Sequence, residues 1–222
     1  MAEKQLTEKE SLDLITSMIN KAKEACHDTG IGAMMWGAVI AICSLVKLAE
    51  IHFDFQLPFD IYLLTFIAVI PQIFISIKGK KERKVKLHED VYNNSLWLSF
   101  GICIFLLIMT INFVFNDWEP VAKEYRELAG HSSAFKFSEY VSAFFLMLYG
   151  LPTFVTGMAL KFKPMLWGGL VCWVCCIVSL FTTFKIDLLL VAFAAIVAWL
   201  IPGIIMEKDY QKAKRELKTV NV

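Results

Sequence analysis

The stretch from Met165 to Met206, MLWGGLVCWVCCIVSLFTTFKIDLLLVAFAAIVAWLIPGIIM, decides the fold of this chain of 222 residues. At about 1.5 Å rise per residue, roughly 20 apolar residues cross the ~30 Å hydrocarbon core of a bilayer, and each half of the stretch has that length. We predict two membrane spans here, near 164–183 and 186–206, joined by a tight turn. Similar runs lie near 32–48, 59–77, 96–115 and 140–160. The sequence therefore predicts an all-α integral membrane protein with a six-span transmembrane domain over 30–206.

The composition agrees with a membrane protein. Hydrophobic residues make up 57% of the chain and charged residues 19%, and the mean hydropathy is +0.58. Water-soluble domains are closer to half apolar and a quarter charged. The net charge of +1 gives no single-signed field that would gather phosphates, which argues against a nucleic-acid partner.

The basic residues are sorted by segment. Seventeen of the 22 Lys and Arg residues lie in 1–29, 78–95, 161–163 and 207–222, and five lie in the alternate segments. Cytoplasmic loops of membrane proteins carry an excess of Lys and Arg. We therefore predict that both termini are cytoplasmic and that 207–222 is a charged cytoplasmic tail extending the last helix into water. We predict that 116–139 is an outward loop, with a short helix starting at Trp118-Glu119-Pro120 and ending near Leu128.

The segment KGKKERKVK, residues 78–86, is the densest group of cations. Near a membrane surface each cation gains about 1 kcal/mol from anionic lipid. The segment either binds anionic lipid head groups or serves only as a topology signal. The six cations concerned are Lys78, Lys80, Lys81, Arg83, Lys84 and Lys86.

Residues 1–29 contain the one long amphipathic segment that we predict. Thr7 and Glu10 form a capping box at its start. Spacings of three and four residues then place five side chains on one helix face, and Gly30 ends the helix. This face either binds a partner or lies on the cytoplasmic membrane surface. Its residues are Leu12, Ile15, Ile19, Ala22 and Cys26.

The chain shows signs of an internal repeat. Trp36 precedes Pro71 by 35 residues, and Trp167 precedes Pro202 by the same interval, so a shift of 131 residues superimposes the first two spans on the last two. Trp97 and Pro152 fit more loosely, because 55 residues separate them. We predict three helical hairpins of like orientation, with an insertion in the middle one.

Small residues and prolines inside the spans should shape the packing. Ala33, Gly37 and Ala41 recur every four residues, a pattern that lets a neighbouring helix backbone approach closely. The prolines kink their helices, either to form a site or gate or only to fit their neighbours. The candidate ligand or gate residues are Pro71, Gln72, Tyr149, Pro152, Thr153, Thr156 and Pro202.

The chemistry expected inside the membrane is sparse. We expect no ionisable side chain in the span interiors, which argues against proton relays and intramembrane catalysis. The remaining polar side chains, which include Thr65, Thr110 and Asn112, either hydrogen-bond between helices or contact an uncharged ligand. Cys172, Cys175 and Cys176 share one helix face, where we expect small packing residues rather than a metal site. We predict no catalytic residue, cofactor or metal site.

The runs ESLDLITSMINKAK, MMWG, FDIYLLTFIAVIPQIFISIK, LYGLPTFVTG, FKPMLWGG and AWLIPGII resemble a group of short six-span inner-membrane proteins found in Bacteroidota. The resemblance covers nearly the whole chain. It implies a bacterial inner-membrane location. The group has no assigned activity, so the resemblance implies no catalytic residues.

Two functions are compatible with these features. The first is a non-catalytic sensing, scaffold or regulatory membrane protein that acts through its N-terminal helix and basic cytoplasmic faces, with a cytoplasmic protein partner. The second is a passive carrier or channel for a small uncharged solute, built from three hairpins around a pseudo-threefold axis. The sequence favours the first, because the second needs a polar pathway that the spans hardly provide.

Overall fold

The computed structural model describes residues 7 and 12 and residues 29–82, 88–129 and 137–220, and every regular element among them is helical. The prediction of an all-α protein is confirmed. Five helices come first, with one 3₁₀ turn: α2 (Ile31–Phe53), α3 (Leu63–Glu82), α4 (His88–Ala129), η1 (Phe137–Tyr140), α5 (Val141–Ala159) and α6 (Lys163–Ser179). The last long helix is built from α7 (Phe184–Ala195), a π-helical turn η2 (Ile196–Leu200) and α8 (Ile201–Val220).

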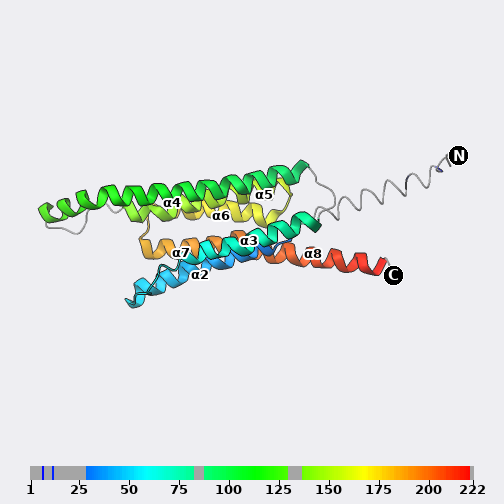
Figure 1. Cartoon of the computed structure of the whole chain (residues 1–222), viewed down its shortest axis with the longest axis horizontal. Coiled ribbons are helices and arrows are strands. Elements are labelled where there is room, and N and C mark those ends of the chain that lie inside the picture. The colour runs from blue at the N-terminus through cyan, green and yellow to red at the C-terminus, as the bar shows by residue number, and fades with distance from the viewer. Residues whose placement is uncertain (1–6, 8–11, 13–28, 83–87, 130–136, 221–222) are drawn as a thin grey trace.

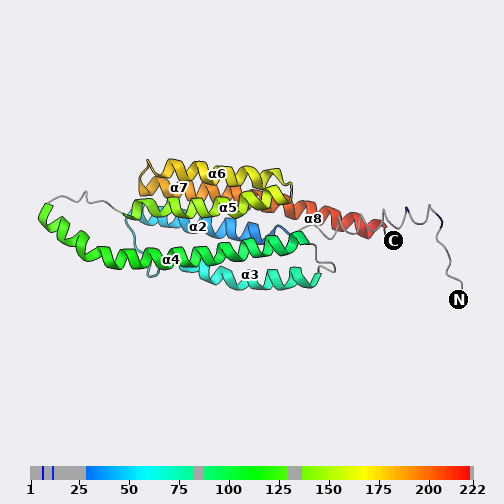
Figure 2. The same ribbon diagram turned by 90° about the horizontal axis from the view of Figure 1, so that it is seen from above.

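The helices run up and down along one axis (Figures 1 and 2). Four are long and apolar enough to cross a membrane, namely Ile31–Phe53, Tyr92–Tyr125, Val141–Ala159 and Phe184–Arg215. Two shorter apolar helices, Leu63–Gly79 and Lys163–Ser179, lie beside them. The predicted turn between the last two helices is confirmed, because α6 ends at Ser179 and α7 begins at Phe184.

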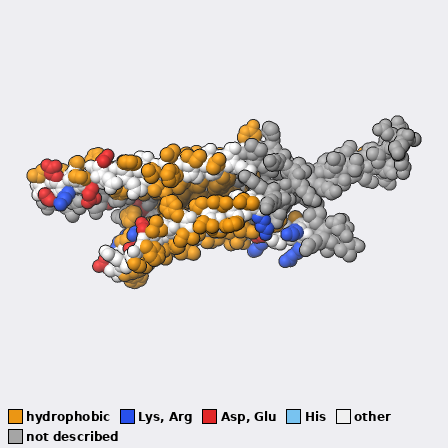
Figure 3. Space-filling view, viewed as in Figure 1, with side chains coloured by type: hydrophobic (Ala, Val, Ile, Leu, Met, Phe, Trp, Pro, Cys, Tyr) orange, Lys and Arg blue, Asp and Glu red, His pale blue; other side chains and the backbone are white. Residues whose placement is uncertain are grey.

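Charge separates the two ends of the bundle (Figure 3). The start of α2, the end of α3, the α5–α6 turn and the end of α8 lie together at what we call the basic end. Its described cations are Lys78, Lys161, Lys163, Lys208, Lys212, Lys214 and Arg215. The opposite, acidic end carries Glu50, Asp54, Asp60, Asp117, Glu119, Glu124, Glu127 and Glu139, together with the cations Lys47, Lys123 and Lys185. The structure thus brings together chain segments that we predicted to share one side of the membrane.

Four helices form an inner bundle whose backbones approach closely: α2, α5, α6 and the α7–η2–α8 helix. A Cβ atom on Gly37 of α2 would lie 2.5 Å from the Leu200 backbone nitrogen, and one on Gly168 of α6 would lie 2.5 Å from the Ala198 Cα. Both distances are shorter than any real side chain tolerates. The predicted close approach along the first span is confirmed at Gly37, and both glycines contact the π-helical turn.

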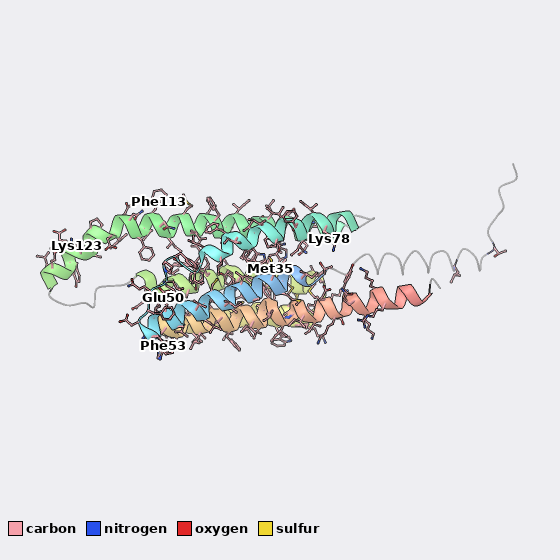
Figure 4. The ribbon with its side chains drawn as sticks, turned by 60° about the horizontal axis from the view of Figure 1, so that its bottom comes forward. Met35, Glu50, Phe53, Lys78, Phe113 and Lys123 are labelled. Carbon is pink, nitrogen blue, oxygen red and sulfur yellow. The ribbon has the colours of Figure 1, made fainter. Side chains whose placement is uncertain are left out.

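The helices α3 and α4 lie outside this inner bundle. The α3 helix packs against α2, and α4 packs against α5. None of the most apolar window of α4 is buried, and Phe113 points away from the other helices (Figure 4). The polar side chains of this exposed surface bond to their own helix, since Thr110 donates to the Leu106 carbonyl and Asn112 to the Ile108 carbonyl. Both groups can therefore face lipid without a second helix.

The predicted break at residues 116–139 is wrong in its first part, because α4 continues without interruption to Ala129. Pro120 lies inside the helix rather than at the start of a new one. A proline removes one backbone hydrogen bond and bends the helix, and Figure 2 shows α4 curving toward this end. Pro120 is exposed, so its ring meets no neighbouring helix that would force a break.

The structure does not confirm the hairpin repeat. When the chain is shifted by 131 residues, Leu63, the first residue of α3, aligns with Ala194. The corresponding helix α7 does not begin there, because it already begins at Phe184. The two prolines also differ, because Pro71 is exposed and Pro202 is fully buried. The α3 helix starts late because Asp60 orders the preceding turn: its carboxylate accepts a hydrogen bond from the Tyr62 amide at 3.0 Å.

We predict that Gly37→Val and Gly168→Val each destabilise the protein strongly, because a side chain at either position pushes the backbone of η2 away. Thermal unfolding in detergent should show a Tm at least several degrees lower than that of the wild type. Gly101→Val on α4 is the matched control, since nothing lies within 4 Å of a Cβ there. Equal losses of stability in all three variants would contradict the inner-bundle assignment.

Candidate functional site in the bundle core

An aromatic cluster surrounds Trp199 of the π-helical turn, which is 3% exposed. The ring of Tyr149 on α5 lies 4.8 Å away between centroids, and the rings of Phe100 and Trp97 on α4 lie at 6.2 and 6.4 Å. These distances fall in the range of favourable edge-to-face contacts. The cluster thus joins α4, α5 and the last helix.

Two hydrogen-bond chains cross this cluster. The Trp199 indole Nε1 donates to the Thr153 hydroxyl at 2.7 Å, and that hydroxyl donates to the Tyr149 carbonyl at 2.7 Å. Nearer the basic end, the Trp97 Nε1 donates to the Thr156 hydroxyl at 3.2 Å, and the same hydroxyl donates to Asn93 Oδ1 at 3.1 Å. Each threonine hydroxyl therefore accepts a hydrogen bond from an indole of another helix and donates its own proton to a second acceptor.

The seven predicted ligand or gate residues do not gather at one place. Four lie buried along α5, namely Tyr149, Pro152, Thr153 and Thr156, and Pro202 is buried in α8. Pro71 is exposed on α3. Gln72, the residue after it, accepts a hydrogen bond from the Trp36 Nε1 at 3.2 Å and donates to Ser76 at 3.3 Å. Gln72 therefore serves the α2–α3 contact, and both residues lie apart from the aromatic cluster.

Sequence reasoning missed the partners of the threonines, which are Trp97, Trp199 and Asn93. A tryptophan in the middle of an apolar run was the available signal, because a buried indole N–H needs an acceptor. Of the polar side chains expected to bond between helices, Thr65, Thr110 and Asn112 instead bond to carbonyls of nearby residues in their own segment.

One expectation about charge is wrong: Asp187, inside the last predicted span, is 0% exposed. The Thr182 hydroxyl donates a short hydrogen bond to its Oδ1, and its Oδ2 has no hydrogen-bond partner. The residue lies in the first turn of α7. The predicted span 186–206 included Asp187, but a single carboxylate near its start was not recognised as an ionisable residue inside the span.

The cysteines lie in packing positions. Cys172 and Cys175 are buried in α6, and the Cys176 thiol donates to the Ala143 carbonyl of α5 at 3.3 Å. On α2, the Cys43 thiol donates to the Ile61 carbonyl at 3.5 Å. Within the described ranges, no three His, Cys, Asp or Glu side chains come together in a group that could hold a metal ion.

Two predicted surfaces fall largely outside the described residues. Leu12 of the N-terminal face is helical and 67% exposed, whereas Glu10, Ile15, Ile19, Ala22 and Cys26 lie outside the description. Among the six cations of the basic loop, Lys78 is exposed at the end of α3. The side chains of the others, Lys80, Lys81, Arg83, Lys84 and Lys86, lie outside the described part of the chain.

Comparison with known proteins adds no relative: no protein-family model matches the chain, and neither a curated protein nor a solved structure is similar to it.

We predict that Thr156→Val loosens α4 from α5, because it leaves the Trp97 indole without its acceptor and Asn93 without its donor. The loss should be about 1–3 kcal/mol in the free energy of unfolding, measured by denaturant titration in detergent. Thr110→Val on α4 makes the same change where the hydroxyl is exposed and bonds only its own helix, so its effect should be much smaller. A loss of similar size in both variants would mean that the α4–α5 bridge contributes nothing.

Proposed function

We propose that this protein is a six-span protein of the bacterial inner membrane, with both termini in the cytoplasm, and that it is a non-catalytic sensing, scaffold or regulatory component acting through its basic end. The observation that carries the proposal is the distribution of polar groups along the bundle. Those in the apolar middle bond to other helices, as Thr153, Thr156 and Gln72 do, or to carbonyls of their own segment, and the exposed charges lie at the two ends.

The helix lengths support six spans. Four helices are long enough by themselves. The apolar parts of α3 and α6 have 17 residues each, which at 1.5 Å per residue gives about 26 Å, the lower limit for a span. Both helices lie parallel to the others in the up-and-down bundle (Figure 2). A bilayer that is spanned by the four long helices would therefore be spanned by these two as well.

The charge distribution supports the orientation. Cations dominate the end at which α3 and α8 finish, and acids dominate the other end (Figure 3). By the positive-inside rule the basic end faces the cytoplasm. Anionic lipid head groups there would gain about 1 kcal/mol per nearby cation, and Lys78 at the end of α3 is positioned for such a contact.

The shape of the basic end supports a role in binding. The α8 helix projects beyond the ends of α5 and α6 (Figures 1 and 2). Its exposed side chains there include Lys208, Lys212 and Arg215, which lie beside Glu207 and Gln211 on the same helix. Together with the predicted N-terminal face, this helix offers a cytoplasmic protein both charged and apolar contacts.

The carrier alternative has less support. It requires the three proline-bearing helices to surround one axis, but Pro71 lies exposed on α3, while Pro152 and Pro202 are buried in the inner bundle. The polar residues expected to line a pathway, Thr153 and Thr156, already bond to tryptophans.

We predict that the variant Ile15→Lys, Ile19→Lys loses a cytoplasmic partner, because two charges interrupt the apolar face of the N-terminal helix. Crosslinking in cells followed by mass spectrometry should show one protein joined to the wild type and absent from the variant. Ser17→Lys adds one lysine on the opposite face of the predicted helix and should keep the partner. Retention of every crosslink by the double variant would contradict a role for this face.

We predict the topology from reporter fusions. A reporter active only outside the cytoplasm should be active when fused after Asn116 and inactive when fused after Gly79 or Val222, and a cytoplasmic reporter should give the opposite pattern. Activity of the external reporter at Gly79 or Val222 would contradict the proposed orientation, and equal activity at Gly79 and Asn116 would show that α4 does not cross the membrane.

A further inference from the structure

Asp187 is an unusual residue for its place in the fold. It is fully buried in the first turn of α7, directly after the short turn that follows α6. The Thr182 hydroxyl holds Oδ1, and the backbone amide of Asp187 donates to the Thr183 carbonyl at 3.0 Å. Oδ2 is buried, and no group of the described residues donates a hydrogen bond to it. Glu207 at the basic end also has a buried oxygen without a partner, but its other oxygen accepts from Gln211 in an exposed, charged setting.

Within the described residues, no cation pairs with Asp187. Lys185 on the same turn is exposed. On α2, Lys47 bonds to Glu50 at 3.0 Å and His52 is exposed. The helices α5 and α6 carry no acidic or basic side chain near this end, and the nearby charge of η1 is Glu139, a second acid.

An ionised carboxylate buried without a counter-charge has a high cost in free energy. In a membrane protein such a residue is a candidate functional site. One positive charge at Oδ2 would remove that cost. A divalent ion such as Ca²⁺ usually takes several carboxylate ligands, and no such group occurs among the described side chains. One carboxylate, with one hydroxyl bonded to it, suits a single charge.

We propose that Asp187 is a binding site for one positive charge, either a small monovalent metal ion or a proton, with Oδ2 as the anchoring atom and Thr182 holding the carboxylate in place. The charge enters from the acidic end. The turn before Asp187 is open to solvent there, since Phe181 is 85% exposed and Thr183 and Lys185 are also exposed. The carboxylates of that end raise the local concentration of cations. The site does not depend on the proposed cytoplasmic role.

The test is thermal unfolding of the full-length protein in detergent, at constant ionic strength, in sodium, potassium or choline chloride and at pH 5 and pH 8. A ligand at about 100 times its Kd should raise the Tm by about 5–10 °C. We expect the wild type to be stabilised by sodium or potassium over choline, or by the lower pH if the bound charge is a proton. In Asp187→Asn, which keeps the shape without the charge, that stabilisation should be absent.

Two further variants make the test decisive. Asp54→Asn removes an exposed acid from the same end, at a left-handed position that asparagine tolerates, and should keep the full response. Thr182→Val keeps the carboxylate but releases it, and should weaken the response even if Asp187→Asn fails to fold. The proposal is overturned if the variants at 187 and 182 respond to ions and pH as the wild type does, or if they lower the Tm equally in every condition.

Discussion

The structure depends on one buried hydrogen bond, from the Trp199 indole to the Thr153 hydroxyl. An indole N–H removed from both water and lipid head groups must find an acceptor, and a hydroxyl on a neighbouring helix is a suitable one. The 2.7 Å bond fixes the last helix against α5. The rings of Tyr149, Phe100 and Trp97 then close around the indole and bring α4 to the same point.

Glycine makes this arrangement possible on the other two sides. The π-helical turn that carries Trp199 is approached by Gly37 from α2 and by Gly168 from α6, so two backbones can come close where any side chain would hold them apart. Such association by close packing replaces the hydrophobic drive that lipid does not provide between helices. The π-helical turn ends just before Pro202, where the missing backbone donor interrupts regular α-helical bonding. From there α8 continues past the bundle, so the same helix connects the aromatic cluster to the basic end.

Hydropathy predicted the all-helical architecture well, because the length of an apolar run is a property of a single segment. The boundaries that failed depend on local chemistry: Asp60 delays the start of α3, and Pro120 bends α4 without ending it. The partners of Thr153 and Thr156 could not be predicted, since they come from helices 46 and 59 residues away in the chain. Asp187 was missed because hydropathy averages over a window, so a single carboxylate at the edge of an apolar run hardly changes it.

The most direct test of the central claim is a double-mutant cycle between Trp199→Phe and Thr153→Val, with free energies of unfolding measured in one detergent. Trp199→Phe keeps an aromatic ring without the donor, and Thr153→Val keeps the shape without the acceptor. If the bond organises the inner bundle, the two losses should not add, and the coupling energy should be about 1 kcal/mol or more. Losses that add to within about 0.3 kcal/mol would show that this bond does not hold the last helix to α5.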